Sequence, residues 1–316
     1  MGEIMDWGNL IYDMGYVVTA ILTVYLSGWL IYDKLATSEY SLSKALFEDR
    51  NFAAGLEVAG FLFVEILIAV SAMSGDEVVK MNDAGIMVTD YYRDLEAVAV
   101  TILFCNLTFF LFRWVASQVL RWRFRGKLDA HGEEVRFNNE IFGQKNLGAS
   151  LFSISYLLVM YFMILQEDFL GTQLYQVESY FNMLSVFLTG LVVYFLHNLV
   201  FLDRGHTTLE ELFIDNNSGV GLSLVGFMFT VLFLQSRLIT QFGQGEHFFN
   251  SSSDTYTYFV LLLVFIVLFR KVFTVALGIF TGRSFQKDFL VEDNPVAGLL
   301  DFAFVSSTGM LLGIIL

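Results

Sequence analysis

The sequence contains a single cysteine, Cys105, and a single proline, Pro295. One cysteine excludes an intrachain disulfide and a site with several thiolate ligands. The four histidines are scattered singly and none has the spacing of metal ligands. No glycine loop for phosphate, nucleophile elbow or zinc-protease motif is present. We therefore expect no metal, no cofactor and no enzymatic activity.

Charge is also scarce. Charged residues make up 16% of the 316 positions, hydrophobic residues 56%, and the mean hydropathy is +0.61. Apolar stretches of the roughly 20 residues that cross a bilayer recur along the whole chain. The sequence predicts an all-α, polytopic integral membrane protein with eight transmembrane helices, near 9–32, 51–73, 95–116, 146–165, 180–202, 217–238, 256–280 and 294–316.

The basic residues give an orientation. All of the 18 lysines and arginines except Lys80, Arg93 and Arg237 lie in, or next to, the connections that follow odd-numbered helices. Because cytoplasmic loops retain positive charge, these connections should be cytoplasmic. Both termini are then expected on the outer side of the membrane.

One pattern occurs four times, each time at the cytoplasmic start of an even-numbered helix: residues 48–60, 143–155, 214–226 and 291–303. The asparagines that align are Asn51, Asn146, Asn217 and Asn294, and four residues after them come Gly55, Ser150, Gly221 and Gly298. An asparagine at the N-cap accepts a hydrogen bond from a free amide of the first turn, and Pro295 is favoured directly after a cap. Small residues allow close helix packing in lipid. The pattern predicts four parallel two-helix repeats, at 1–75, 76–166, 167–239 and 240–316.

The segment Asn51-Phe-Ala-Ala-Gly55 resembles the bacterial YjfL-like membrane proteins, called domain of unknown function 350. Their unit is a two-helix hairpin whose second helix begins with an Asn-x-Ala-Ala-Gly-like sequence. The third and fourth copies are similar, and the second departs with Ser150. The resemblance implies a multi-pass protein of the bacterial cytoplasmic (inner) membrane, and it lends no established activity.

Ionisable residues inside membrane spans are costly and often functional. The candidates are Glu57, Asp301, Glu65 and His197. Glu57 and Asp301 follow their caps by six and seven residues, which places both about 10 Å into the helix. If the first and last repeats adjoin around a ring, the two carboxylates share a site that holds a proton or a cation. In the alternative, each carboxyl bonds a neighbouring helix and remains neutral, or pairs with a base such as His197. Parallel repeats fit either a ring or a pair of four-helix halves.

The longest cytoplasmic segment, 117–145, carries a basic patch of Arg121, Arg123, Arg125 and Lys127. We interpret this patch as a surface for anionic lipid headgroups, with docking of a cytoplasmic protein as the alternative. The expected partners are the bilayer, such a protein and a second copy of the chain, but not nucleic acid. The leading functional hypothesis is a small-ion or proton-coupled transport or channel component, and the alternative is a non-transporting scaffold that recruits a cytoplasmic partner.

The orientation can be tested with single cysteines in a Cys105→Ala background. We expect Ala130→Cys to react with an impermeant thiol reagent only from the cytoplasmic side, and Asn250→Cys only from the outer side, because the basic connections stay inside. Labelling of intact cells and of inverted vesicles measures this. The opposite labelling pattern would overturn the orientation.

Overall fold

A computed structural model describes residues 7–36, 39–73, 79–81, 87–89, 91–129, 131–165, 177–203, 205–242 and 253–315. Its body is helical, as the sequence predicts. The long helices are α1 Trp7–Ile31, α2 Phe52–Met73, α3 Tyr91–Arg123, α4 Leu147–Leu165, α5 Val177–Leu196, α7 Ser218–Phe242, α8 Ser253–Thr281 and α10 Pro295–Ile315. The repeat boundary expected at 239 therefore falls inside the last turn of α7. Outside the described residues lie the boundaries at 75 and 166, the test positions 130 and 250 and both chain ends.

Shorter elements, which the sequence analysis did not predict, connect these helices. A two-stranded antiparallel hairpin pairs β1 (Val79–Met81) with β2 (Met87–Thr89). Short helices lie on the side of the molecule where the row of cap asparagines lies, namely η1 Tyr32–Ala36, η2 Lys44–Glu48, η3 Asn139–Gly143, η5 His197–Phe201, α6 Thr208–Phe213 and α9 Phe285–Leu290. Of these, η2, η3, α6 and α9 each directly precede one of the four asparagines.

Seven of the described helices are long and apolar enough to cross a membrane, which supports the membrane class. Their candidate spans are Phe52–Val70, Ala99–Arg123, Leu147–Leu165, Met183–Phe201, Ser218–Ile239, Thr255–Thr281 and Pro295–Ile315. Helix α1, with 25 residues, is not among them. An eighth span stays a prediction.

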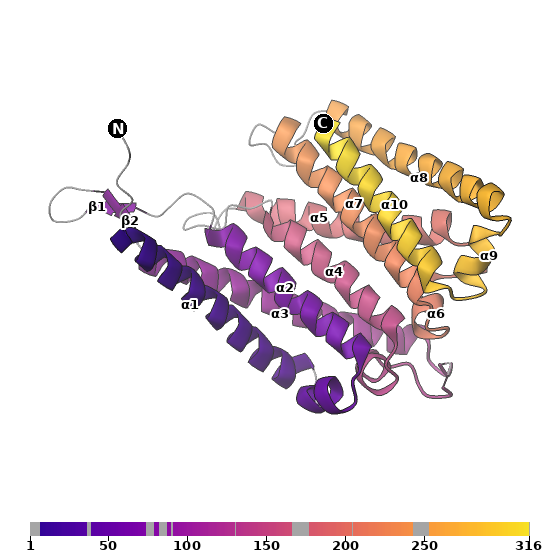
Figure 1. Cartoon of the computed structure of the whole chain (residues 1–316), viewed down its shortest axis with the longest axis horizontal. Coiled ribbons are helices and arrows are strands. Elements are labelled where there is room, and N and C mark those ends of the chain that lie inside the picture. Colours follow the sequence, from indigo (N-terminus) through magenta and orange to yellow (C-terminus); the bar gives the residue numbers. More distant parts are fainter. Residues whose placement is uncertain are drawn as a thin grey trace.

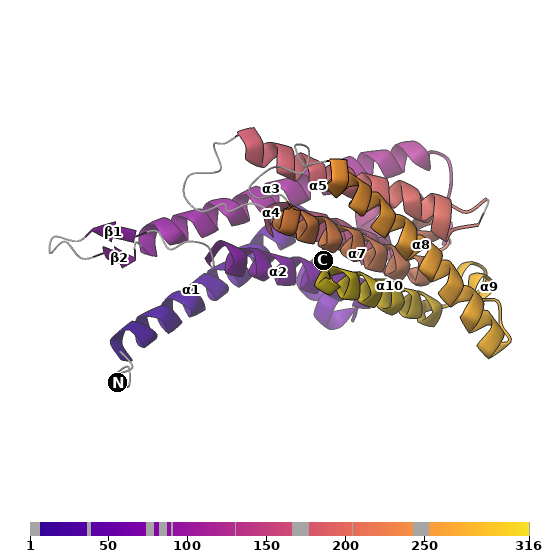
Figure 2. The same cartoon turned by 90° about the horizontal axis from the view of Figure 1, so that it is seen from above.

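Helices α2, α4, α7 and α10, which we call the row helices, lie side by side in chain order and run in the same direction (Figures 1 and 2). Helix α3 packs against α2 and α4, α5 against α4 and α7, and α8 against α7 and α10, while α1 packs against α2 and α3. Helices α2 and α10 are the two ends of the row. The arrangement is thus an open row, and not the ring that the sequence analysis considered.

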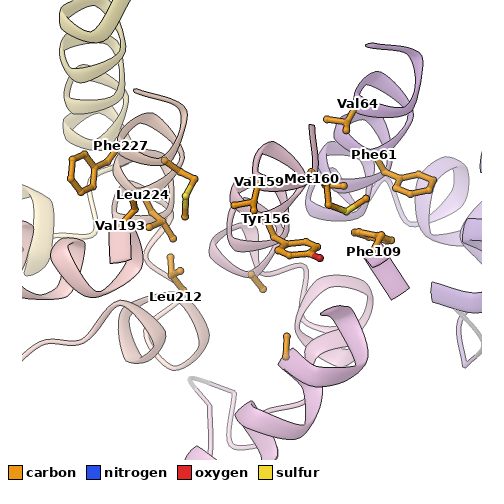
Figure 3. Close-up of a cluster of buried hydrophobic side chains, with 14 of the residues drawn as sticks. Phe61, Val64, Phe109, Tyr156, Val159, Met160, Val193, Leu212, Leu224 and Phe227 are labelled. Carbon is orange, nitrogen blue, oxygen red and sulfur yellow. The ribbon is translucent and has the colours of Figure 1, made fainter. Parts of the chain in front are cut away.

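Apolar side chains fill the space between neighbouring row helices. Figure 3 shows Tyr156, Val159 and Met160 of α4 between Phe61 of α2 on one side and Leu224 of α7 on the other. The Phe61 ring contacts that of Phe109, with ring centroids 4.9 Å apart. In lipid such close packing, and not exclusion of water, holds helices together.

Each cap asparagine begins its row helix in nearly the same way. The side-chain oxygens of Asn51, Asn146 and Asn217 accept from the amide three residues later at 3.0–3.1 Å, and Asn294 accepts from Val296 N at 2.9 Å. The residue before each cap is left-handed, with φ between 48° and 59°: Arg50, Lys145, Asn216 and Asp293. A non-glycine residue rarely adopts this conformation, so its presence at four matching positions marks one shared local structure.

The cap side chains also bond across the row. The Nδ2 amide of Asn51 donates to Ile141 O at 2.8 Å, that of Asn146 to Leu212 O at 2.9 Å and that of Asn217 to Phe289 O at 3.0 Å. Each acceptor lies five residues before the next cap. These amides therefore tie every row helix to the turn that precedes the next one.

The small residues four positions after the caps lie at these contacts, with one exception. Ser150 Oγ donates to Ala53 O at 2.9 Å, a methyl group on Gly298 would collide with the backbone of Gly219, and one on Gly221 would lie 2.8 Å from Leu151 Cβ. Around Gly55, the nearest atom to such a methyl is Leu46 Cδ2 at 3.7 Å. Gly55 is on the outer face of the first row helix.

We expect Asn51→Ala to lower the free energy of unfolding by about 1–3 kcal/mol, because it leaves a buried amide and two buried carbonyls without their partner. Asn294→Ala should cost about 1 kcal/mol or less, since that side chain makes one local cap bond. Unfolding of the detergent-solubilised protein measures both. Equal losses would contradict the role assigned to the cross-row bond.

Candidate functional site

A first buried polar cluster surrounds Glu57 of α2. Tyr32 Oη donates to Glu57 Oε2 at 2.6 Å, Ser153 Oγ of α4 donates to Oε1 at 2.5 Å, and Arg113 of α3 forms an ion pair with Oε1. Glu57 has no exposed surface and Arg113 is 5% exposed. Each of the long helices α1 to α4, counting η1 with α1, contributes one side chain.

The Arg113 guanidinium has partners besides the carboxylate. Its Nε and Nη2 donate to Asn138 Oδ1 at 3.1 and 2.9 Å, and it lies over the Phe137 ring at 4.7 Å from the centroid. A buried charge costs free energy unless it is paired and hydrogen-bonded. Segment 137–138, between α3 and α4, supplies this extra stabilisation.

A second cluster surrounds Asp301 of α10. Arg270 Nε of α8 donates to Asp301 Oδ1 at 2.7 Å, and Ser223 Oγ of α7 donates to Oδ2 at 2.5 Å. His197 links to the same serine, with Nε2 3.2 Å from Ser223 Oγ and Nδ1 2.9 Å from Thr208 Oγ1. Arg270 lies over the Phe201 ring at 4.0 Å.

The two clusters correspond position by position. Glu57 and Ser223 both follow their caps by six residues, and Ser153 and Asp301 both follow theirs by seven. A carboxylate and a serine therefore face each other in both halves, with the two roles exchanged. Arginines from α3 and α8 and ring-bearing side chains from η1 and η5 complete the match, namely Arg113, Arg270, Tyr32 and His197.

The structure does not bring Glu57 and Asp301 together. They lie on α2 and α10, at opposite ends of the open row, and each pairs with its own arginine. The shared carboxylate site considered from the sequence is therefore wrong, and its premise, adjacent first and last repeats, is the reason. His197 reaches Asp301 only through Ser223.

Sequence reasoning counted Arg113 and Arg270 only as cytoplasmic-side charges. Both positions fall inside the predicted apolar stretches 95–116 and 256–280. An arginine inside such a stretch favours a buried acidic partner, and the acidic candidates were Glu57, Glu65 and Asp301. That signal would have indicated arginine–carboxylate pairs within the spans.

Glu65, two turns beyond Glu57 on α2, makes a separate contact. Asn106 Nδ2 of α3 donates to Glu65 Oε1, and Asn106 also donates to Ile102 O at 2.9 Å. Glu65 Oε2 is buried, and no described residue bonds to it. The carboxyl lies against Gly28 of α1, where a side chain would collide with it.

Two further buried acids, Glu140 and Glu211, precede the caps of the second and third copies by six residues. Glu140 accepts from Asn146 Nδ2 at 2.9 Å and Glu211 from Asn217 Nδ2 at 3.0 Å. Burial raises the pKa of Glu140 to about 7, and the pKa of Glu211 is raised for the same reason. The spacing of six before an asparagine was the signal that the sequence analysis missed.

The basic patch lies apart from both clusters. Arg121 and Arg123 are in the last turn of α3, which extends beyond the predicted end at 116, and with Arg125 they are exposed. Lys127 pairs with Glu210 at 2.8 Å. The later part of 117–145 packs into the protein, with Phe137 and Ile141 buried, so it offers less free surface than expected.

Within the part of the chain that the structure describes, no group of three or more His, Cys, Asp or Glu residues is placed to hold a metal ion. The two clusters present paired charges and hydroxyl groups.

Arg113→Met should lower the free energy of unfolding by about 3–5 kcal/mol, because it leaves Glu57 buried without its counter-charge. The double variant Arg113→Met/Glu57→Leu should lose less than Arg113→Met alone. As a matched control, Lys127→Met removes an exposed pair and should cost about 1 kcal/mol or less. Detergent unfolding curves provide the numbers, and similar losses for Arg113→Met and Lys127→Met would contradict the assignment.

Comparison with known proteins bears on the family. Residues 5–165, just over half of the chain, match the family model described as Domain of Unknown Function (DUF350). The matched region contains the whole Glu57 cluster. No curated protein and no solved structure matches the chain. The chain therefore belongs to the family described as Domain of Unknown Function (DUF350).

Proposed function

We propose that this protein moves a small ion, in exchange or together with protons, past the two arginine–carboxylate clusters. The observation that carries the proposal is the buried ion pair in each half, Glu57–Arg113 and Asp301–Arg270, placed among apolar helices. Charges in such positions are costly, and they commonly mark ion or proton pathways.

The proposal includes eight spans built from four parallel repeats, in an inner membrane with both termini outside. Helix α1 has 25 residues, more than the roughly 20 that a bilayer requires, and it packs beside α2 and α3. The left-handed residue, the cap and the preceding short helix recur in all four copies. These features support descent of each hairpin from one unit.

Each cluster is suited to opening and closing. When a proton or cation takes the place of the arginine at Glu57, the guanidinium keeps Asn138 and the face of Phe137 as partners. The hydroxyl groups of Tyr32 and Ser153 already contact the carboxylate and can stay with it. The pair would then have a second arrangement in which both charged groups keep partners, as alternating binding requires.

In the second cluster, the same exchange at Asp301 leaves Arg270 over Phe201. Ser223 continues the hydrogen-bonded chain to His197 and Thr208, towards the cap side of the row. This series of hydrogen bonds offers a proton a route to Asp301. In the first cluster, the Tyr32 hydroxyl takes the equivalent place beside Glu57.

Reconstituted proteoliposomes test the proposal through ion and proton flux. Because the two clusters lie in different halves, Glu57→Gln and Asp301→Asn should each lower the flux, and the double variant should abolish it. Lys127→Gln, which neutralises an exposed charge, serves as the matched control and should leave flux unchanged. Size-exclusion profiles and thermal stability verify folding. The proposal is overturned if the folded double variant keeps flux at the wild-type level. It is also overturned if the wild-type protein gives no flux under a broad set of ions and gradients.

A scaffold that recruits a cytoplasmic protein is the second candidate. Arg121, Arg123 and Arg125 are exposed, and Trp122 among them is 79% exposed. Charge reversal of the three arginines separates the candidates in the same preparations, since it should remove a copurifying partner only if this surface docks one and should not alter ion flux.

A further inference from the structure

The row of helices has two unlike ends, and the contacts inside the row follow one rule. At each of the three internal interfaces, the cap asparagine of the earlier helix donates to the carbonyl five residues before the next cap. The rule therefore needs a donor on one side and an acceptor on the other. Four copies in an open row leave one of each unused.

The unused donor is Asn294 and the unused acceptor is Leu46 O. Among the described residues, Asn294 is the one cap whose Nδ2 donates no hydrogen bond, and its side chain is partly exposed. Leu46 lies five residues before Asn51, and no cap of this chain donates to its carbonyl. If the two ends met, this donor and this acceptor would pair as the corresponding groups do inside the row.

The packing surfaces show the same pairing. Inside the chain, the residue nine after a cap approaches the residue eight after the next cap: a methyl on Gly60 would lie 3.1 Å from Ile154, and one on Gly226 would lie 2.8 Å from Phe302 Cα. At the free ends these positions are Ala303 and Ala59, and both are exposed. Small residues on both sides permit a closer approach than the internal contacts.

A further contact recurs at two of the three internal interfaces. Four residues after a cap, Ser150 and Gly298 contact the residue two after the preceding cap, Ala53 and Gly219. The unmatched pair is Gly55, where an added methyl would meet only Leu46 Cδ2 at 3.7 Å, and Val296, which is 60% exposed. Phe52, 71% exposed, lies on the same face of α2 as Gly55 and Ala59.

One contact on the cap side can be transferred to the free ends in the same way. Lys145, which precedes the second cap, donates through Nζ to Asp49 O, two residues before the first cap, at 2.9 Å. The equivalent free positions are Arg50 at one end and Glu292 at the other, and both are exposed. The Glu292 carboxylate pairs with Lys287 of its own copy at 3.1 Å, and the contact available to Arg50 is the Glu292 backbone carbonyl.

We propose that copies of this protein associate head to tail in the membrane, with α10 of one copy against α2 of the next, so that the row of helices continues. All row helices run in the same direction (Figure 1), so the repeated operation keeps every copy in one orientation across the bilayer. In the extended row, α1 packs against α2 of its own copy and α10 of its neighbour, as α3 packs against α2 and α4.

This interface is heterologous, meaning that its two faces differ. Such contacts produce rings when the rotation between copies closes and open chains when it does not. The inference is independent of transport, because both charge clusters lie within one copy.

Cysteine cross-linking in a Cys105→Ala background tests the geometry. Full-length protein with Ala59→Cys and Ala303→Cys together should form a ladder of oligomers when membranes are oxidised. Two chains that each carry one of the cysteines should give a dimer only when they are coexpressed, because the faces are unlike. A matched pair, Ala99→Cys with Ala303→Cys, places one thiol on an exposed position of α3 and should give no ladder.

Added bulk provides a second measurement. Gly55→Leu and Ala303→Leu should each reduce the cross-linked or native-mass oligomer by about tenfold or more, because a filled interface cannot accept the extra atoms. Ala99→Leu adds comparable bulk elsewhere and should have no effect. Dimers from Ala303→Cys alone would show a contact between two identical faces. A ladder no stronger than that of the Ala99 control would show that lipid covers these ends. Either result overturns the proposal.

Discussion

The side-chain amide of the cap asparagine is the interaction on which the rest of this structure depends. Its oxygen begins a row helix, and its nitrogen bonds the backbone that precedes the next one, as Asn146 does with Ala149 N and Leu212 O. One residue thereby sets both where a helix starts and how far it lies from its neighbour. In a bilayer, where burial of apolar surface does not favour one helix contact over another, such polar bonds and close packing fix the register.

That register aligns the polar clusters. Because the caps hold neighbouring helices at constant height, the residue six after one cap faces the residue seven after the next, and Glu57 meets Ser153 as Ser223 meets Asp301. The carboxylate lies on the earlier helix of the pair in the first half and on the later helix in the second half. In both halves an arginine forms an ion pair with it. The two halves thus keep one architecture with the charged side chain exchanged, which is compatible with two sites of related but unequal chemistry.

An open row also gives the protein a direction within the membrane plane. The α2 end presents a carbonyl, Gly55 and Arg50, whereas the α10 end presents Asn294, Val296 and Glu292. The bond from cap amide to carbonyl already joins such surfaces at all three internal interfaces. Continuation of the row between copies uses no new type of contact, and it covers the faces that a single copy leaves exposed to lipid.

The sequence by itself determined the helices, their approximate ends, the cap positions and the family, because apolar length, capping asparagines and small residues act locally. It also placed Glu57, Asp301, Glu65 and His197 within the apolar helices. Only the tertiary structure decided which groups meet: Glu57 with Arg113, Glu65 with Asn106 and Asp301 with Arg270, and not Glu57 with Asp301. A ring and an open row have the same hairpins and the same caps, and they differ in the rotation between neighbouring units. That rotation depends on side-chain packing between helices far apart in the sequence, so no local sequence pattern indicates it.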